Sequence, residues 1–199
     1  GYAARHRDRR NGAFAAVVNH TGTVSLSDTY QFVDANVQTN METLFMGPPS
    51  QNPFDWTRAS SIVLDAASQL VPGADHMAIN LTTTPVKTIY GIGDSRAYLV
   101  EQSIQLDQFF QSVGATNHLL EPTPLPTPCP DGHCWSTADE LLVCDWFETN
   151  TLNETPAAGT ILTDRASRWG RYDVTPDVAD SFTQVDFAVD ESINAITFS

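Results

Sequence analysis

The stretch that decides the fold runs from residue 86 to residue 135, and it opens with VKTIYGIGD (86–94). Its first five residues are mostly β-branched or aromatic, which predicts a strand. The glycines that follow predict a turn, so Asp94 stands directly after the strand. Residues 98–113 carry apolar side chains near a helical period, and Gly114 stands where many helices end. The order is therefore strand, acid turn and helix.

A second strand and a second turn complete this unit. We expect a short strand at 117–120, followed by a loop in which Pro occupies every second position from 122 to 130. Such a loop suits neither a helix nor a central strand, and it leads to DGHCW (131–135). Neighbouring parallel strands then deliver Asp94 and His133 from their ends. A buried carboxylate beside a His fixes its tautomer and stabilises the imidazolium, so these two residues are the candidate catalytic pair. No nucleophile is evident in the chain.

The segment before this unit predicts one more strand and a long insertion. Residues 13–18 form an apolar run that suits a strand buried on both faces, and His20 stands where this strand ends. A His at this position either lines a site or is a hydrogen-bonded structural residue. Residues 23–60 look irregular and turn-rich, as expected of a lid or substrate wall. Their aromatic residues Phe54 and Trp56 either contact a substrate or pack the insertion itself.

The remaining segments predict two helices and a small β unit. Residues 60–70 have the apolar spacing of a helix, and a final helix is expected at 139–147 with Ser136 as its N-cap. Residues 150–160 look like a linker. Residues 161–199 contain strand-like pieces, which favours a small antiparallel β appendage.

The predicted fold class is therefore α/β, with an incomplete parallel sheet flanked by helices in residues 1–149 and the appendage at the end of the chain. The chain opens as if inside a helix and stops inside its last strand, so both ends look truncated. If strands are missing, an open apolar sheet edge is expected beside 14–18.

Composition restricts the classes of partner. The chain has 24 acidic and 10 basic residues and a formal charge of −14, which argues against binding to nucleic acid. No apolar run approaches the ~18 residues of a membrane span. The spacing of His6, His20, His76 and His118 is not typical of a zinc site, and no other metal or cofactor is expected.

The cysteines and the N-glycosylation patterns bear on the compartment of the protein. The three cysteines are Cys129, Cys134 and Cys144, so at least one is free or paired outside the chain, and the first two are close enough to close a small ring. The N-glycosylation pattern occurs at Asn19, Asn80 and Asn153, although it often occurs by chance. Together these features favour an extracellular or periplasmic protein.

The order of elements over residues 1–147 resembles the C-terminal half of an α/β-hydrolase of the esterase, depolymerase and prolyl-oligopeptidase-like branch. YGIGD (90–94) resembles the strand and acid turn of that family, and DGHCW (131–135) resembles its Gly-His loop before the final helix. The opening GYAA resembles the residues directly after a G-x-S-x-G nucleophile elbow.

This resemblance implies a serine hydrolase acting on esters, including polyesters or aryl esters. It assigns Asp94 as the orienting acid and His133 as the general base and acid. The nucleophilic Ser and the oxyanion donors would then lie before Gly1, in a missing N-terminal half that is the expected partner, and the chain alone would be inactive. The residues expected to bind the substrate are His20, Phe54, Trp56 and Trp135. The resemblance implies no metal and no cofactor.

Three alternatives stay open at the level of sequence. In tannase-like and feruloyl-esterase-like enzymes a Cys beside the His pairs with a Cys beside the Ser, which would compete with a Cys129–Cys134 bond. Gly93-Asp94-Ser95 also resembles the Gly-Asp-Ser block of the SGNH hydrolases, which would make Ser95 the nucleophile. Finally, the chain is open to interpretation as a non-catalytic unit, either a hydrolase-like subunit or a carbohydrate- or surface-binding module.

Overall fold

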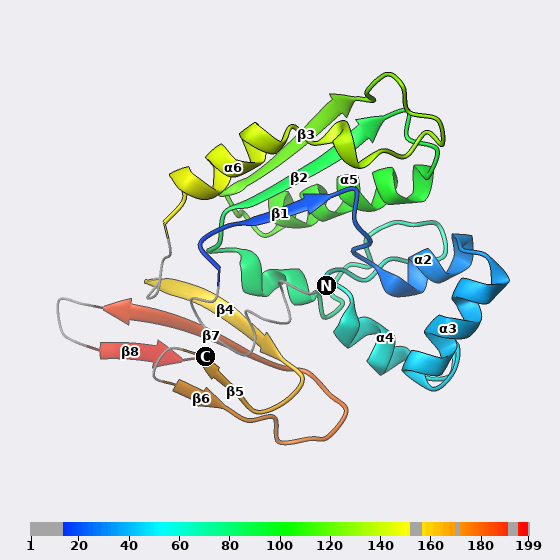
Figure 1. Ribbon diagram of the computed structural model, residues 1–199. Helices are drawn as coiled ribbons and strands as arrows, with labels where there is room; N and C mark the ends of the chain where they lie inside the picture. Colours follow the sequence, from blue (N-terminus) through cyan, green and yellow to red (C-terminus); the bar gives the residue numbers. More distant parts are fainter. Residues whose placement is uncertain (1–13, 152–156, 170–171, 191–194, 199) are drawn as a thin grey trace.

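A computed structural model describes residues 14–151, 157–169, 172–190 and 195–198 (Figure 1). Its central element is a three-stranded parallel sheet in the order β1-β2-β3. The strands are β1 (Val17–His20), β2 (Val86–Ile92) and β3 (His118–Pro124). The register pairs Val17 with Val86 and Val86 with His118, so the three strands end at the same edge of the sheet.

Helices cover both faces of this sheet, which confirms the predicted α/β class. Val86 packs in the main core with Phe109 and Phe110 of α5 (Ala97–Ser112). Lys87, the next residue, points to the opposite face because side chains alternate along a strand. Its ammonium lies 5.2 Å from the ring centroid of Trp146 in α6 (Glu140–Thr149). The same ammonium forms a 3.1 Å ion pair with Glu121 on β3.

The expectation of an irregular insertion at 23–60 is wrong. The segment contains three short helices, which are α2 (Leu26–Phe32), α3 (Ala35–Phe45) and α4 (Pro53–Ala59). Asp34 caps α3, because its side chain accepts hydrogen bonds from the backbone N–H groups of Asn36 and Val37. Two of these helices, α2 and α4, have only seven residues each, and turn-rich junctions dominate the sequence pattern.

A buried polar network attaches α2 to α5. The Asp28 side chain is completely shielded from solvent. It accepts a 2.7 Å hydrogen bond from the Ser68 hydroxyl and another of 2.7 Å from the Gln102 amide. The Gln102 carbonyl oxygen in turn accepts from the backbone N–H groups of Val24 and Ser25. One Gln side chain on α5 thereby fixes the start of the insertion.

The helix expected at 60–70 is also wrong, because this segment consists of turns and a short antiparallel bridge between Leu64 and Leu70. The Asp65 side chain accepts hydrogen bonds from the N–H groups of Ala67 and Gln69. Such side-chain acceptors compete with the helical backbone for its donors and stabilise a turn. An apolar residue of this segment still packs in the main core, since Leu64 is buried there.

Two boundaries near the second turn differ from expectation. β3 continues through Pro122 and Pro124, which are tolerated because β3 is an edge strand of the described sheet. The N-cap of α6 is Asp139 and not Ser136, because the Asp139 carboxylate accepts from the N–H groups of the two leucines after Glu140. Among the side chains described in α6, none is buried, and Leu141 is 75% exposed.

The C-terminal part contains antiparallel strands, as expected (Figure 1). One sheet has the order β4-β7-β8, and a separate pair is formed by β5 and β6. Their bounds are β4 (Ala158–Thr163), β5 (Ser167–Trp169), β6 (Tyr172–Val174), β7 (Thr183–Asp190) and β8 (Ala195–Phe198). β4 therefore begins inside the segment 150–160 that looked like a linker.

Asn80 joins this second sheet to the main body. It lies in a 3₁₀ helix, η1 (Met77–Leu81), and is 1% exposed. Its amide donates to the carbonyl oxygen of Leu162 and accepts from the Leu162 N–H, at 2.8 and 2.7 Å. Leu162 also belongs to the main hydrophobic core with Met77 and Leu81. Leu162 thus connects the second sheet to the main core, whereas Ile161 and Phe187 of that sheet form a separate small cluster.

Two expectations about the surface can be compared with the structure. Within the described residues β1 pairs with β2 alone. Residues 14–18, beside which an exposed apolar edge was expected, are half-buried or buried. Among the helices described, none combines the length and the apolar character that crossing a membrane requires.

Candidate active site

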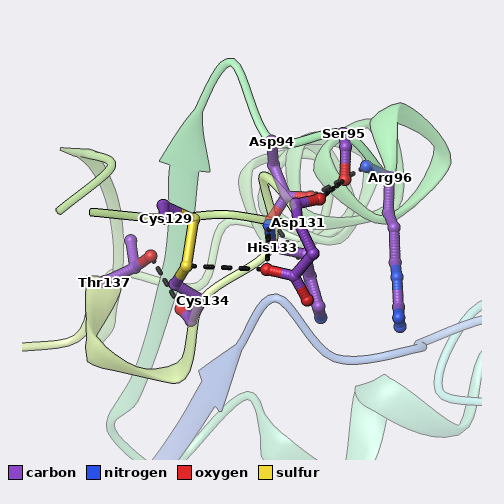
Figure 2. Close-up of a disulfide and its surroundings, with 8 residues drawn as sticks. All are labelled: Asp94, Ser95, Arg96, Cys129, Asp131, His133, Cys134 and Thr137. Atoms are coloured by element: carbon purple, nitrogen blue, oxygen red, sulfur yellow. Dashed lines mark hydrogen bonds and ion pairs between the residues drawn. A yellow bond between two sulfur atoms is a disulfide. The ribbon is translucent and has the colours of Figure 1, made fainter. Parts of the chain in front are cut away.

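Asp94 and His133 meet at the carboxyl edge of the parallel sheet (Figure 2). Asp94 follows β2 in a turn in which Gly93 has a φ of +79°. The Asp94 residue is 7% exposed, and its Oδ2 lies 2.8 Å from Nδ1 of His133. Its Oδ1 accepts a 2.8 Å hydrogen bond from the backbone N–H of Arg96. Because an ionised carboxylate only accepts, Nδ1 of His133 carries the proton and Nε2 is the nitrogen free to accept one.

The two residues come from the ends of different strands. β2 leads directly into the acid turn, whereas a longer Pro-containing loop connects β3 to His133. The sequence predicted this meeting from strand order alone. The catalytic role of the pair stays a prediction.

A disulfide closes the loop that carries His133. Cys129 and Cys134 are bonded, with their Cα atoms 5.9 Å apart, so His133 lies inside a ring of six residues. Within this ring the Gly132 N–H donates to the carbonyl oxygen of Cys129 at 3.1 Å. The disulfide decides between the two cysteine pairings that the sequence left open, since Cys134 is joined to Cys129. Cys144 is free and exposed.

Ser95 ties the acid turn to the His loop. Its hydroxyl donates to the carbonyl oxygen of Asp131 (Figure 2), and its backbone N–H donates to the carbonyl oxygen of Gly132, both at 2.8 Å. Gly132 has a φ of +67°, and a Cβ at this position would lie 3.0 Å from Cβ of Ser95. The loops therefore approach each other closely because residue 132 has no side chain.

This contact bears on the SGNH alternative, in which Ser95 is the nucleophile. The Ser95 hydroxyl proton is directed to a backbone carbonyl and not to an imidazole. Sequence reasoning missed the connecting role of Ser95. Its position directly after Asp94, together with a Gly directly before His133, was the available signal.

His20 lies at the end of β1, next to this pair. Its ring makes an edge-on contact with Trp135, with the ring centroids 5.1 Å apart. Both ring nitrogens are shielded from solvent and have no hydrogen-bond partner in the part of the chain that the structure describes. Burial lowers the pKa of His20, the nearby charge of His133 lowers that pKa further, and Asp94 opposes both effects. Three parallel strands thus bring His20, Asp94 and His133 together, with the exposed Trp135 at the margin.

The other two predicted substrate-binding residues lie elsewhere, on α4. Trp56 is 1% exposed and packs against Tyr30 and Phe45, with centroid distances of 5.3 and 4.5 Å. Its indole N–H donates to the carbonyl oxygen of Gly47. For Trp56 the packing interpretation therefore holds, because a buried ring cannot contact a substrate. Phe54 is half-buried and packs against Phe182 at 5.2 Å.

The site offers little to a metal ion. Among the described residues, one group of potential ligands lies close enough together, namely Cys129, Asp131 and Cys134. Two of its three atoms are the sulfurs of the disulfide, which are not thiolates.

Comparisons with known protein families, with curated protein sequences and with solved structures gave no significant match to the chain. Any function proposed for the chain accordingly rests on the geometry of the site.

Proposed function

We propose that Asp94 and His133 are the acid and the base of a Ser-Asp-His triad that hydrolyses carboxylic esters. The observation that carries this proposal is the 2.8 Å contact between Oδ2 of a nearly buried Asp94 and Nδ1 of a partly exposed His133. This contact holds the imidazole in the tautomer that leaves Nε2 free to accept a proton. The surrounding loops restrain the same geometry through Ser95 and through the disulfide.

In the proposed reaction, Nε2 of His133 takes the proton of a Ser hydroxyl as the oxygen attacks an ester carbonyl. Asp94 stabilises the imidazolium that results. The proton then passes to the leaving alcohol, and an acyl-enzyme forms. His133 next takes a proton from water, which attacks the acyl group, and the proton returns to the Ser oxygen as the acid is released. No external electron or proton donor is needed.

The nucleophile is proposed to lie in residues that precede Gly1, as in the C-terminal half of an α/β-hydrolase. The pairing of β1 with β2 alone, within the described residues, supports this arrangement, because strands of an N-terminal half would pair on the other side of β1. Polyesters and aryl esters are the proposed substrates. The disulfide suits an oxidising compartment, which supports an extracellular or periplasmic location.

The test compares two polypeptides, the 199 residues alone and the same residues preceded by their natural upstream sequence. We expect the longer polypeptide to hydrolyse p-nitrophenyl butyrate and to be labelled by a fluorophosphonate. We expect neither activity from the shorter one. His133→Gln should abolish turnover in the longer polypeptide.

Two results would contradict the proposal. Turnover by the shorter chain that is lost in Ser95→Ala would favour the SGNH mechanism. An inactive, unlabelled but folded longer polypeptide would favour the non-catalytic binding unit.

A further inference from the structure

A pocket of about 580 Å³ lies beside the acid turn. It is formed where α5 begins and where α2 gives way to α3, and its lining includes Ser95 and Arg96, the two residues after Asp94. The pocket and the Asp94–His133 pair therefore share one turn of the chain. In Figure 2 the side chains of Arg96 and His133 extend to the same side of the two loops.

Arg96 differs from the other cations that the structure describes. Those are held by carboxylates, with Arg58 and Arg165 paired to Asp164 and Lys87 paired to Glu121. Arg96 is exposed and has no carboxylate within ion-pair distance among the described residues. In a chain with 24 acidic residues, an unpaired guanidinium in a pocket is a cation available to a ligand.

The pocket also has an aromatic wall. Phe32 and Tyr98 are stacked, with ring centroids 5.0 Å apart and planes 8° apart. Phe32 is 51% exposed, so this stack presents an apolar surface to solvent. Asp34 also lines the pocket, but its Oδ1 is engaged by the first N–H groups of α3. The pocket therefore combines a flat apolar surface with one guanidinium that has no ion-pair partner among the described residues and one carboxylate, Asp34, which keeps its negative charge and is held at the start of α3.

We propose that this pocket binds the carboxylate of an anionic aromatic ligand, with Arg96 holding the carboxylate and Phe32 and Tyr98 contacting the ring. A guanidinium matches a carboxylate with two parallel hydrogen bonds. The substrate class that follows rests on the proposed function. Under that function, the preferred substrate is an ester that also carries a free carboxylate.

The binding itself is testable on the 199-residue chain without any nucleophile. We would titrate ¹⁵N-labelled protein with 3-phenylpropanoate and, separately, with 3-phenylpropanamide, which has nearly the same shape and no charge. The acid should shift the backbone resonances of Arg96 and Tyr98 and bind about tenfold more tightly than the amide. Added salt should weaken binding of the acid and leave that of the amide unchanged.

Matched variants separate charge from ring contact. Arg96→Gln should reduce the affinity for the acid to that of the amide, whereas Arg165→Gln, which alters a cation already paired with Asp164, should change neither. Phe32→Ala should weaken both ligands by a similar factor. Unchanged spectra elsewhere in each variant show that the fold is retained.

The proposal is overturned if acid and amide bind equally, if neither shifts these resonances at any soluble concentration, or if Arg165→Gln has the effect expected of Arg96→Gln. If the acid does not bind in this pocket but the longer polypeptide hydrolyses esters, the catalytic proposal stands and the pocket proposal fails. If the acid binds but no ester is hydrolysed, the pocket proposal stands and the catalytic proposal fails.

Discussion

Two carboxylates, those of Asp28 and Asp94, are almost removed from solvent and yet differ in what surrounds them. Asp28 is bonded to the Ser68 hydroxyl and the Gln102 amide, neither of which changes charge. Asp94 is bonded to a backbone N–H and to the imidazole of His133, a side chain that can both accept and donate protons. The first network fastens one helix to another, and the second joins two loops at the ends of strands.

Burial alone therefore does not distinguish Asp94, the carboxylate that we propose to be catalytic, from Asp28. A buried Asp needs hydrogen-bond donors wherever it lies, because an unpaired buried charge is costly. The nature of the donor decides what the carboxylate does. Asp28, with neutral donors, holds α2 against α5, whereas Asp94 orients His133, the residue that we propose to exchange protons.

The largest effect that would sharpen this comparison is expected from Asp94→Asn in the catalytically complete polypeptide. An amide here would favour the wrong His133 tautomer, so kcat should fall by about 10⁴-fold. Asp28→Asn should leave kcat of the folded protein nearly unchanged. Initial rates with p-nitrophenyl butyrate measure both. Equal losses in the two variants would contradict the distinction.

Asp28→Asn, which should leave kcat nearly unchanged, is expected to lower the stability of the fold. In Asp28→Asn an amide N–H₂ would face either the Ser68 hydroxyl or the Gln102 amide, and one buried donor would lose its acceptor. The free energy of unfolding should fall by about 1–3 kcal/mol. Urea denaturation followed by circular dichroism measures it. Asp34→Asn is the matched control at an exposed N-cap, where Asn and Asp are similarly favourable, and it should cost only a few tenths of a kcal/mol.

The site was more predictable from the sequence than the network around Asp28. A β-branched run ending in a glycine turn indicated β2 and placed Asp94, and a clear helical period indicated α5. These local signals, with the order of the strands, were sufficient to bring Asp94 and His133 to one edge. Nothing local could show that Gln102 on α5 contacts a residue 74 positions earlier.

The errors at 23–60 and 60–70 have a common physical origin. In both segments, side-chain oxygens that bind nearby backbone N–H groups set the local structure, as Asp34 does at the start of α3 and Asp65 does in its turn. An Asp is compatible with either outcome, so apolar spacing misled us where Asp65 stabilises a turn. The Asp139 cap was missed for a similar reason, because Ser136 was an equally good candidate.

A smaller loss of kcat is expected when the disulfide in the His133 loop is removed. Replacing Cys129 and Cys134 together by Ser opens the ring around His133, while the bonds from Ser95 still hold the loop near Asp94. We expect kcat to fall by about tenfold, because small misplacements of a catalytic group are costly. The control is Cys144→Ser, at the free and exposed cysteine, which should have no effect. A loss in the control alone would show that the ring is dispensable.

The smallest effect is expected in the titration of His20, followed by the ring resonances of His20 in NMR spectra. Because the charge of His133 lowers the pKa of His20 and Asp94 raises it, His133→Gln should raise this pKa and Asp94→Asn should lower it. Asp28→Asn should leave it unchanged. The absence of both shifts would mean that His20 does not belong to this cluster.

The lowered pKa of His20 also fixes the direction of a pH effect on stability. In the unfolded chain the pKa of His20 keeps its usual value of 6.5. Between pH 6.5 and the lower pKa of the folded state, the unfolded chain therefore binds more protons than the folded chain. This contribution to stability is complete above about pH 6.5 and is lost as the pH falls toward the folded-state pKa. The pKa of His76 is lowered too, chiefly by burial, and acts in the same direction. His20→Gln should remove only part of the slope.

The burial of Asn80 bears on the choice of expression host for this protein. This residue begins the sequon Asn80-Leu81-Thr82, and a eukaryotic secretory pathway adds glycans to such sites as the chain emerges, before it folds. A sugar there would block the contact with Leu162 that joins the two sheets. Yeast or mammalian secretion should therefore yield misassembled material. The bacterial periplasm, which oxidises cysteines and adds no such glycan, is the appropriate host.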